Sequence, residues 1–116
     1  SSYGENEVRT NLQMGAVETL LISENLKTNR QTYECPACGT LDVITTKQHQ
    51  KAPEKQCPKC GEIMKIIKTQ ETAEELIELA EEVNTDVEVI SIETEEGTQL
   101  DKAFGGIAGL LRYKVK

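Results

Sequence analysis

The feature that most constrains this chain is a pair of short cysteine motifs. Cys-Pro-Ala-Cys-Gly occupies residues 35–39, and Cys-Pro-Lys-Cys-Gly occupies residues 57–61. Two residues between cysteines let both sulfurs face one ion from a tight turn, and the glycine that follows permits the positive φ that turns backbone N–H groups toward the thiolates. The spacing therefore predicts a closed tetrahedral site for one structural Zn²⁺ ion, with Cys35, Cys38, Cys57 and Cys60 as ligands.

Other uses of four cysteines fit this pattern less well. Disulfides are disfavoured because nothing in the sequence marks the chain as secreted and the two pairs repeat one turn. A redox pair begins a helix after a strand, whereas Gly39 and Gly61 follow the cysteines here. Iron remains an alternative, because four thiolates in a tetrahedron suit it as well. With Zn²⁺ all four positions are filled by protein thiolates and none is left for catalysis, so the expected role is structural.

The cysteines lie in a segment that we interpret as an inserted zinc-ribbon mini-domain at residues 30–70. Residues 41–46 and 63–67 are rich in β-branched and apolar side chains and are predicted to be its strands. Residues 24–33 are polar and lack periodicity, so we place the start of the insert there. The rest of the chain, residues 1–29 and 71–116, forms the main domain. A segment of about 40 residues needs the metal to fold, because it is too small to build its own core.

The main domain alternates helical and strand patterns, which favours an α/β fold. Thr72 and Glu75 form a capping box at the start of an amphipathic helix, and Thr98 with Asp101 is predicted to cap a later one. Residues 94–97 are predicted to be a turn. We therefore expect a small mixed sheet packed with helices, with the zinc ribbon inserted. The expected helices begin at residues 5, 72 and 98, and the expected strands cover 16–23, 86–93 and 110–115.

Charge is unevenly distributed along the 116 residues, whose formal net charge is −7. Residues 71–101 contain twelve carboxylates and no Lys or Arg, whereas residues 30–68 contain seven basic and four acidic side chains. Such an acidic chain is a poor non-specific binder of nucleic acid. The acidic stretch is interpreted either as a solvated helix face or as a surface for a basic partner, and both readings stay open.

No arrangement of residues indicates catalysis. His49 is the only histidine and lies in a polar loop, so neither a metal triad nor a Ser-His-Asp arrangement is available. Gly105, Gly106 and Gly109 lack the Gly-Lys-Ser/Thr ending of a phosphate loop and are better explained by close packing of the last helix on the sheet. No signal peptide or apolar run of about 20 residues is present. We expect a cytoplasmic protein that is not an enzyme and has no membrane partner.

Several segments of the main domain together form a recognisable pattern: Tyr3-Gly4, Glu7-Val8, Met14 to Glu24, Val89 to Ser91, Glu95 to Gln99, Ala103 to Ile107 and Leu110 to Tyr113. These segments resemble the C-terminal domain of class 1 peptide chain release factors of archaea and eukaryotes. The resemblance covers most of residues 3–115, and the four-cysteine insert is similar to the mini-domain of the archaeal branch.

The resemblance implies a docking role in translation termination. Other domains of these factors read the stop codon and carry the Gly-Gly-Gln motif that triggers peptidyl-tRNA hydrolysis, and that motif is absent from this sequence. The C-terminal domain binds a translational GTPase, of the elongation factor 1-alpha type in archaea, and lies near the ATP-binding-cassette ATPase that recycles ribosomes. The motifs place the GTPase contact at Phe104, Gly105, Gly106 and Ile107, with Leu12 on the first helix as a weaker candidate.

Two alternatives remain. The final domain of the ribosome-rescue factor Pelota shares the Gly-Ala-Val to Leu-Leu-Ile-Ser pattern, but it generally lacks the cysteine insert. A zinc-ribbon nucleic-acid-binding module is the other alternative, because the insert is basic and can contact RNA within a ribosomal complex.

Overall fold

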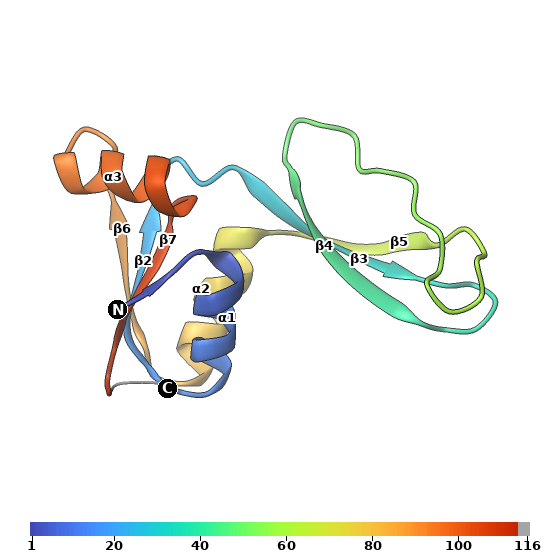
Figure 1. Ribbon diagram of the computed structural model, residues 1–116, viewed down its shortest axis with the longest axis horizontal. Coiled ribbons are helices and arrows are strands. Elements are labelled where there is room, and N and C mark those ends of the chain that lie inside the picture. Colours follow the sequence, from blue (N-terminus) through green and yellow to red (C-terminus); the bar gives the residue numbers. More distant parts are fainter. Residues whose placement is uncertain (114–116) are drawn as a thin grey trace. The chain divides into compact units, whose positions relative to one another are not determined.

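The computed structural model describes residues 1–113 and divides into two compact units (Figure 1). Residues 1–26 and those from Leu76 onward form the first unit, and residues Lys27–Glu75 form the second. The elements, in chain order, are β1 (Ser2–Tyr3), α1 (Glu5–Gln13), β2 (Val17–Ser23), β3 (Thr28–Glu34), β4 (Leu41–Lys47), β5 (Lys65–Glu71), α2 (Thr72–Glu82), β6 (Asp86–Ile90), α3 (Glu95–Phe104) and β7 (Ile107–Leu111).

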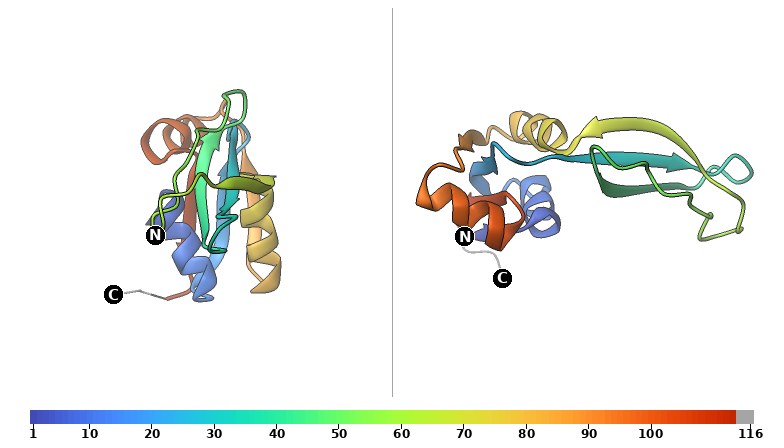
Figure 2. Two further views of the ribbon diagram at one scale, coloured as in Figure 1. Left: turned by 90° about the vertical axis from the view of Figure 1, so that its right-hand side faces the viewer. Right: turned by 90° about the horizontal axis from the view of Figure 1, so that it is seen from above.

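A four-stranded mixed sheet organises the first unit. Its strand order is β1-β7-β2-β6, in which β6 runs parallel to β2 while β7 is antiparallel to both β1 and β2. Helices α1 and α2 lie side by side over one face of this sheet, and α3 lies over the other face (Figure 2). This arrangement confirms the expected mixed α/β architecture.

The core of the first unit lies between the sheet and helices α1 and α2. Side chains in β2 alternate, so Leu20 and Ile22 are buried on this face while Leu21 is only half-buried on the other. Each fully buried aliphatic side chain contributes about 1.5–3 kcal/mol to folding. The helices supply the matching residues Val8, Leu12, Leu76 and Ala80, all fully buried.

The glycines near the chain's end allow close packing, as the sequence indicated, but against different partners. A Cβ at Gly109 would lie 3.2 Å from a methyl carbon of Val17, and a Cβ at Gly106 would lie 3.2 Å from the Ser23 Cβ. The close approach is therefore made by β7 and the residue before it to β2 and not by α3. Gly105 ends α3 in the left-handed conformation, with φ of 63°.

Helix α1 begins after Gly4, which has no side chain to cap it, and Glu7 in the first turn bonds back to the two residues before Gly4. Its carboxylate accepts a hydrogen bond from the Tyr3 amide at 2.8 Å and another from the Ser2 hydroxyl at 2.9 Å. The Tyr3 amide first, and then Ser2, hold the pKa of Glu7 below its ordinary value of 4.5. The charge of Glu7 also interacts favourably with the N-terminal end of the helix dipole.

Helix α3 begins earlier than the sequence predicted. Thr94, not Thr98, is its N-cap, because the Thr94 hydroxyl accepts a hydrogen bond from the Gly97 amide at 2.9 Å. The expected turn at residues 94–97 is therefore wrong, and these residues form the cap and first turn. The Thr98 hydroxyl instead donates to the Ile92 carbonyl at 2.8 Å.

Several predicted strands differ from the observed ones. The last strand begins at Ile107 rather than residue 110, because Gly105 ends α3 and Gly106 turns the chain back to the sheet. Strand β6 ends at Ile90, since Ser91 already bonds with the α3 cap. The predicted ends of the last strand at residues 114 and 115 lie outside the described residues. Strand β1 was not predicted, because two residues carry no periodic signal.

Helix α2 begins at Thr72, as predicted, and the Thr72 hydroxyl bonds to strand β3. It accepts a hydrogen bond from the Thr28 hydroxyl at 2.7 Å. At the other end, the Arg112 guanidinium donates to the carbonyls of Val83 and Asn84, at 3.2 and 2.7 Å. A cation at the C-terminal end of a helix is stabilising, since the last carbonyls lack partners within the helix.

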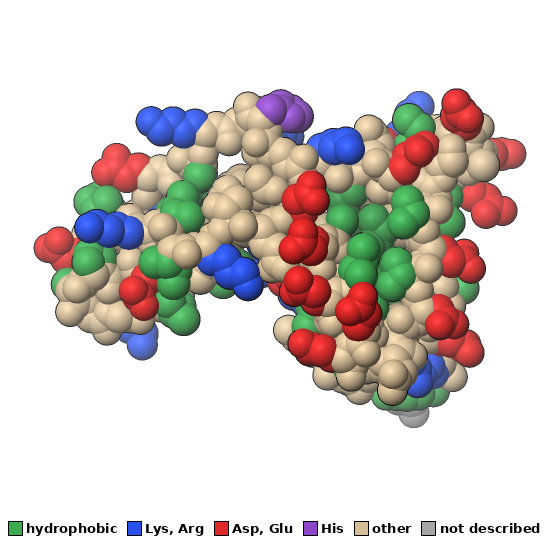
Figure 3. All heavy atoms as spheres, turned by 180° about the vertical axis from the view of Figure 1, so that it is seen from behind, with side chains coloured by type: hydrophobic (Ala, Val, Ile, Leu, Met, Phe, Trp, Pro, Cys, Tyr) green, Lys and Arg blue, Asp and Glu red, His purple; other side chains and the backbone are tan. Residues whose placement is uncertain are grey.

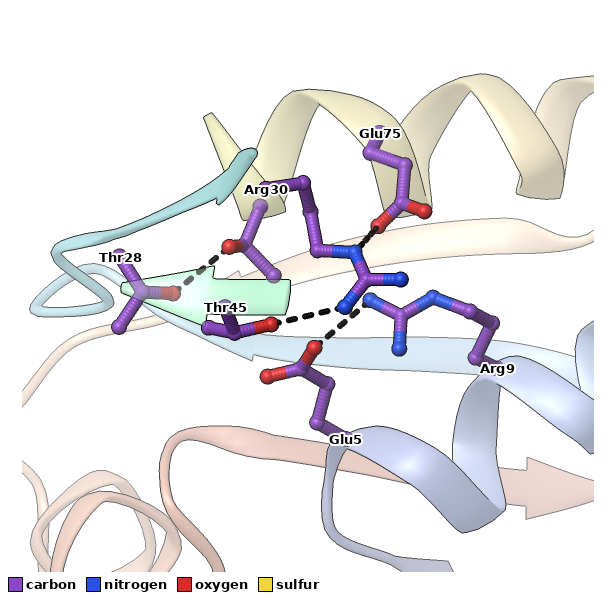
Figure 4. Close-up of polar contacts among 7 residues, drawn as sticks. Glu5, Arg9, Thr28, Arg30, Thr45 and Glu75 are labelled. Carbon is purple, nitrogen blue, oxygen red and sulfur yellow. Dashed lines mark hydrogen bonds and ion pairs between the residues drawn. The ribbon is translucent and has the colours of Figure 1, made fainter. Parts of the chain in front are cut away.

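The second unit contains a three-stranded antiparallel sheet with the order β4-β3-β5. Its central strand β3 falls in the polar stretch that the sequence left without structure. The Arg30 guanidinium lies between Glu75 and Thr45, at 3.5 Å from the carboxylate and 2.9 Å from the hydroxyl (Figure 4). Gln31 is buried and donates to Thr46 at 3.2 Å. Polar side chains that bond across strands explain why a strand without apolar alternation forms here.

Substituting Gly97 tests the packing of α3. A Cβ at this position would lie 1.7 Å from the Ser91 carbonyl oxygen, so Gly97→Ala must displace backbone. We expect a loss of about 3 kcal/mol in the free energy of unfolding. The exposed Gln99→Ala, two residues later on the same helix, should change it by less than about 0.5 kcal/mol. Urea denaturation of both variants gives the comparison, and equal stabilities would contradict this packing.

Acidification tests the role of Glu7. A carboxyl whose pKa is lowered by folding stabilises the native state above its unfolded pKa, and this contribution is lost as the pH falls through the folded value. We expect Glu7→Gln to be less stable than the wild type at pH 7 and the difference to shrink below about pH 4. Thermal unfolding between pH 7 and pH 2.5 measures it. A difference that does not vary with pH would contradict the proposed charge interaction.

Candidate metal centre and docking surface

The four cysteine sulfurs converge in the second unit. All four Sγ atoms lie within 4.8 Å of one another, with 3.4 Å between those of Cys35 and Cys60 and 3.7 Å between those of Cys38 and Cys57. These separations far exceed a disulfide bond of about 2.05 Å. Four thiolates about 2.3 Å from a central ion lie about 3.8 Å apart, which is close to the observed values. The sulfurs are therefore arranged as ligands of one ion.

Two equivalent turns present these sulfurs. The Gly39 amide donates to the Cys35 carbonyl and the Gly61 amide to the Cys57 carbonyl, both at 2.9 Å. Both glycines have positive φ, 76° and 82°, as the motif required. Within the turns, the Cys38 amide points at the Cys35 sulfur at 3.5 Å and the Lys59 amide at the Cys57 sulfur at 3.4 Å. Backbone dipoles thus favour thiolates at both turns.

The pKa values of the thiols differ between the positions. Hydrogen bonds from the amides of Cys60 and Lys59 lower the pKa of Cys57 to about 6. The hydroxyl and amide of Thr40 lower the pKa of Cys38. Against the opposing amide of Glu62, the neighbouring thiols of Cys35, Cys38 and Cys57, together with desolvation, raise the pKa of Cys60 to about 12. Adjacent sulfurs resist carrying four negative charges together, and a divalent cation between them would offset two of those charges.

A small core surrounds the sulfurs. Tyr33, Cys35, Cys57 and Met64 are buried together, with Ile44 packed against them. The Tyr33 hydroxyl donates to the Pro53 carbonyl at 2.7 Å, which fastens the long loop between β4 and β5. Two of the five members of this core are themselves cysteine ligands. An ion at this centre would be held by Cys35, Cys38, Cys57 and Cys60, with no position left for a substrate.

The residues assigned to partner binding lie at the end of α3 and in the core. Gly105 is exposed and Phe104 is half-buried, whereas Gly106, Ile107 and Leu12 are buried. The Phe104 ring stacks on Tyr3, with ring centroids 4.2 Å apart and planes 22° from parallel. No local pattern predicts this pairing, since Tyr3 is 101 positions away in a two-residue strand.

A hollow of about 640 Å³ opens beside this aromatic pair, between α3 and the face of the sheet that α1 and α2 leave free. Its floor is apolar and its rim on α3 is acidic and polar. It is lined by Tyr3, Leu21, Ile90, Thr94, Glu95, Glu96, Gln99, Leu100, Phe104 and Ala108.

Acidic side chains dominate the surface of the first unit. In the right-hand part of Figure 3, hydrophobic side chains are exposed between two groups of acidic side chains. His49, the only histidine, is exposed in the turn after β4. None of the helices among residues 1–113 is long and apolar enough to cross a membrane.

Comparison with known proteins gives a consistent set of relatives. The family described as eRF1 domain 3 matches residues 1–115. The chain is 84% identical over its whole length to peptide chain release factor subunit 1 of Methanosphaera stadtmanae, of which it spans 28%. A solved structure, the C-terminal domain of a peptide chain release factor from Methanosarcina mazei, is 41% identical with a TM-score of 0.89, over 97% of this chain and 70% of that one.

The Pelota protein of Thermoplasma acidophilum has the same fold. Its structure matches 98% of this chain and 23% of its own length, with a TM-score of 0.55 and 22% identity. At that identity the likeness concerns fold alone.

Removing the metal tests the centre. With its sulfurs unbridged, the small core around Tyr33 cannot offset the entropy of ordering the second unit. We expect the purified chain to hold one metal ion, and a chelator to abolish amide protection in β3, β4 and β5 while leaving that in β2 and β7 intact. Hydrogen exchange and elemental analysis measure both effects.

Cys60→Ser should reproduce the effect of the chelator, and Ala37→Ser in the first turn should retain the metal. Loss of structure throughout the chain on chelation would contradict the separate folding of the two units.

Proposed function

The chain belongs to the eRF1 domain 3 family, and on that premise we propose that it is the C-terminal docking domain of an archaeal translation termination factor. In this proposal it binds a translational GTPase of the elongation factor 1-alpha type and the ATP-binding-cassette ATPase that recycles ribosomes. It works in the cytoplasm, at the ribosome, as part of a longer factor and contains no catalytic centre.

One observation carries the proposal: the apolar hollow beside the Tyr3–Phe104 stack lies on the face of the sheet that only α3 covers. Exposed apolar surface of this kind marks binding sites more often than scattered single residues do. Aromatic side chains that are rigidly held and partly exposed are frequent anchors of protein interfaces. Phe104 meets both conditions, since the Tyr3 ring supports it from one side.

The other residues assigned from the resemblance have supporting positions in this proposal. Gly105 is exposed beside Phe104 and lets a partner approach the backbone at the end of α3. Gly106 and Ile107 are buried under this corner, where they hold the start of β7 against β2. Leu12 is fully buried in α1, so its contribution to binding is to fix the position of that helix.

The second unit serves as a rigid appendage in this proposal. We assign Zn²⁺ to the four-thiolate centre, with iron as the alternative, because the sulfur geometry suits a tetrahedral ion and leaves no open position. The metal then takes no part in chemistry. Its role is to order a three-stranded sheet that would otherwise lack a sufficient core.

An RNA-binding module is the alternative function, favoured by the excess of basic residues between positions 30 and 68. Titration of the chain with ribosomal RNA at physiological salt separates the two. Tight binding that weakens steeply with salt would favour the RNA-binding module. A Pelota-like rescue factor is the other alternative, supported only by fold.

Substituting Phe104 tests the docking surface. We expect the wild-type chain to bind an archaeal elongation factor 1-alpha type GTPase in a pull-down, and Phe104→Ala to weaken binding at least tenfold, or about 1.4 kcal/mol. Loss of the ring stack also lowers the free energy of unfolding by about 1 kcal/mol. Isothermal titration calorimetry and urea denaturation on the same samples separate the two effects.

Phe104→Tyr keeps the aromatic ring and should retain most of the affinity. Met14→Ala removes an apolar side chain that is 54% exposed elsewhere on the unit, and should bind like the wild type. The absence of binding by the wild-type chain, or full binding by a folded Phe104→Ala variant, would contradict the proposal.

A further inference from the structure

Strand β6 is the outer strand of the four-stranded sheet, and its free side is open. It pairs with β2 alone among residues 1–113. The Ile90 carbonyl accepts a hydrogen bond from the Glu24 amide, which turns the backbone of Ile90 toward β2. Because backbone direction alternates along a strand, Glu88 also faces β2, whereas the N–H and C=O groups of Val87 and Val89 face outward. Those outward groups form a template for another strand.

Of the features that normally block such pairing, this edge has charged side chains, Asp86 and Glu88, but no lysine, proline or bulge. Residues 86–90 read Asp-Val-Glu-Val-Ile, and their pairing with β2 proceeds without a register shift. Val89 is 63% exposed, the largest exposed fraction among the large hydrophobic side chains of residues 1–113. A strand added to this edge would cover this apolar side chain.

The two faces of the edge differ in character, and this specifies the chemistry of the missing strand. Val87 and Val89 are in register with Leu20 and Ile22, so their side chains lie on the face covered by α1 and α2. Asp86 and Glu88 lie on the opposite face and are exposed. Across an added strand, apolar side chains would therefore meet the valines and basic ones would meet the carboxylates.

Charge argues against a second copy of this chain as the occupant. Two β6 edges brought together would place Asp86 and Glu88 beside the same residues of the other copy, and like charges across strands are destabilising. Residues 71–101, which contain α2, β6 and most of α3, have twelve carboxylates and no basic side chain. A basic segment is attracted to this surface, and an acidic or neutral one is not.

We propose that the open edge of β6 binds an extended segment of a partner protein in which apolar and basic residues alternate, adding it to the sheet as a fifth strand. The outward backbone groups of Val87 and Val89 supply the affinity, and the alternation of valine and carboxylate supplies the specificity. Ile90 at the end of β6 also lines the hollow, but Val87 and Val89 do not, so this inference does not rest on the proposed function.

The test uses the whole chain and a blocked seven-residue peptide in which lysine and valine alternate. Titration calorimetry should show saturable binding that weakens at least fivefold between 50 and 300 mM salt. Hydrogen exchange should slow at least tenfold at the amides of Val87 and Val89. The amides of Glu88 and Ile90 already face β2 and serve as the internal control. A peptide that alternates glutamate and valine should not bind.

Val89→Pro removes an outward N–H group without breaking a bond to β2, and should weaken binding at least tenfold. Val89→Thr keeps the N–H group and the branched shape, and should stay within about threefold of the wild type. If Val89→Pro does not fold, the exchange measurement on the wild type decides. Absence of binding, or binding without slower exchange at Val87 and Val89, would overturn the proposal.

Two other occupants are tested in the same experiment. Residues 114–116 read Lys-Val-Lys, so a chain ending at Tyr113 is compared with the whole chain. Peptide binding by the shortened chain only would identify this segment as the occupant and overturn the proposal. A concentration-dependent dimer in sedimentation velocity that Val89→Pro abolishes would do the same in favour of a second copy.

Discussion

The convergence of four cysteine sulfurs is the constraint on which the second unit depends. Residues 27–75 bury only a handful of apolar side chains, and two of these are cysteines of the candidate metal centre. Cross-strand hydrogen bonds of Gln31 and Arg30 give the sheet its register, but such bonds contribute modestly because water competes for the same groups. An ion that joins two distant turns would lower the conformational entropy of the unfolded chain and bind the folded one. It would thereby supply the stability that the small core cannot.

In the first unit the decisive constraint is the uneven covering of one sheet. Alternation in β2 directs Leu20 and Ile22 toward α1 and α2, and Leu21 toward the face that only α3 covers. Helix α3 is ten residues long and its last residue already stacks on Tyr3, so part of that face stays open. The hollow is thus a consequence of the sheet being wider than the helix that covers it.

The sequence was most informative where spacing alone determines geometry. The four ligands, β2 and the amphipathic α2 were all predicted, because each depends on a local period or a fixed interval. Strand β3 was missed because its stability comes from neighbours on both sides and not from apolar alternation. The start of α3 was misplaced by four residues, since Thr94 and Thr98 are equally good caps in sequence. What distinguishes Thr94 from Thr98 is the Ser91 carbonyl, which lies close to Gly97 and accepts a hydrogen bond from the Thr94 hydroxyl. The Tyr3–Phe104 stack joins opposite ends of the chain and leaves no local signal.

The acidic stretch at residues 71–101 is better understood from the fold than from composition. Part of it is a solvated face of α2, as the simpler interpretation held. In β6, however, Asp86 and Glu88 alternate with two valines along an open strand, and Val89 is exposed. Solvation of the carboxylates alone does not account for an exposed valine between them. Carboxylates at this position prevent two copies from pairing while leaving the edge able to accept a basic strand. The same charges therefore protect the free protein from pairing with a second copy and favour a basic partner strand. This explains why the edge carries acidic rather than basic residues.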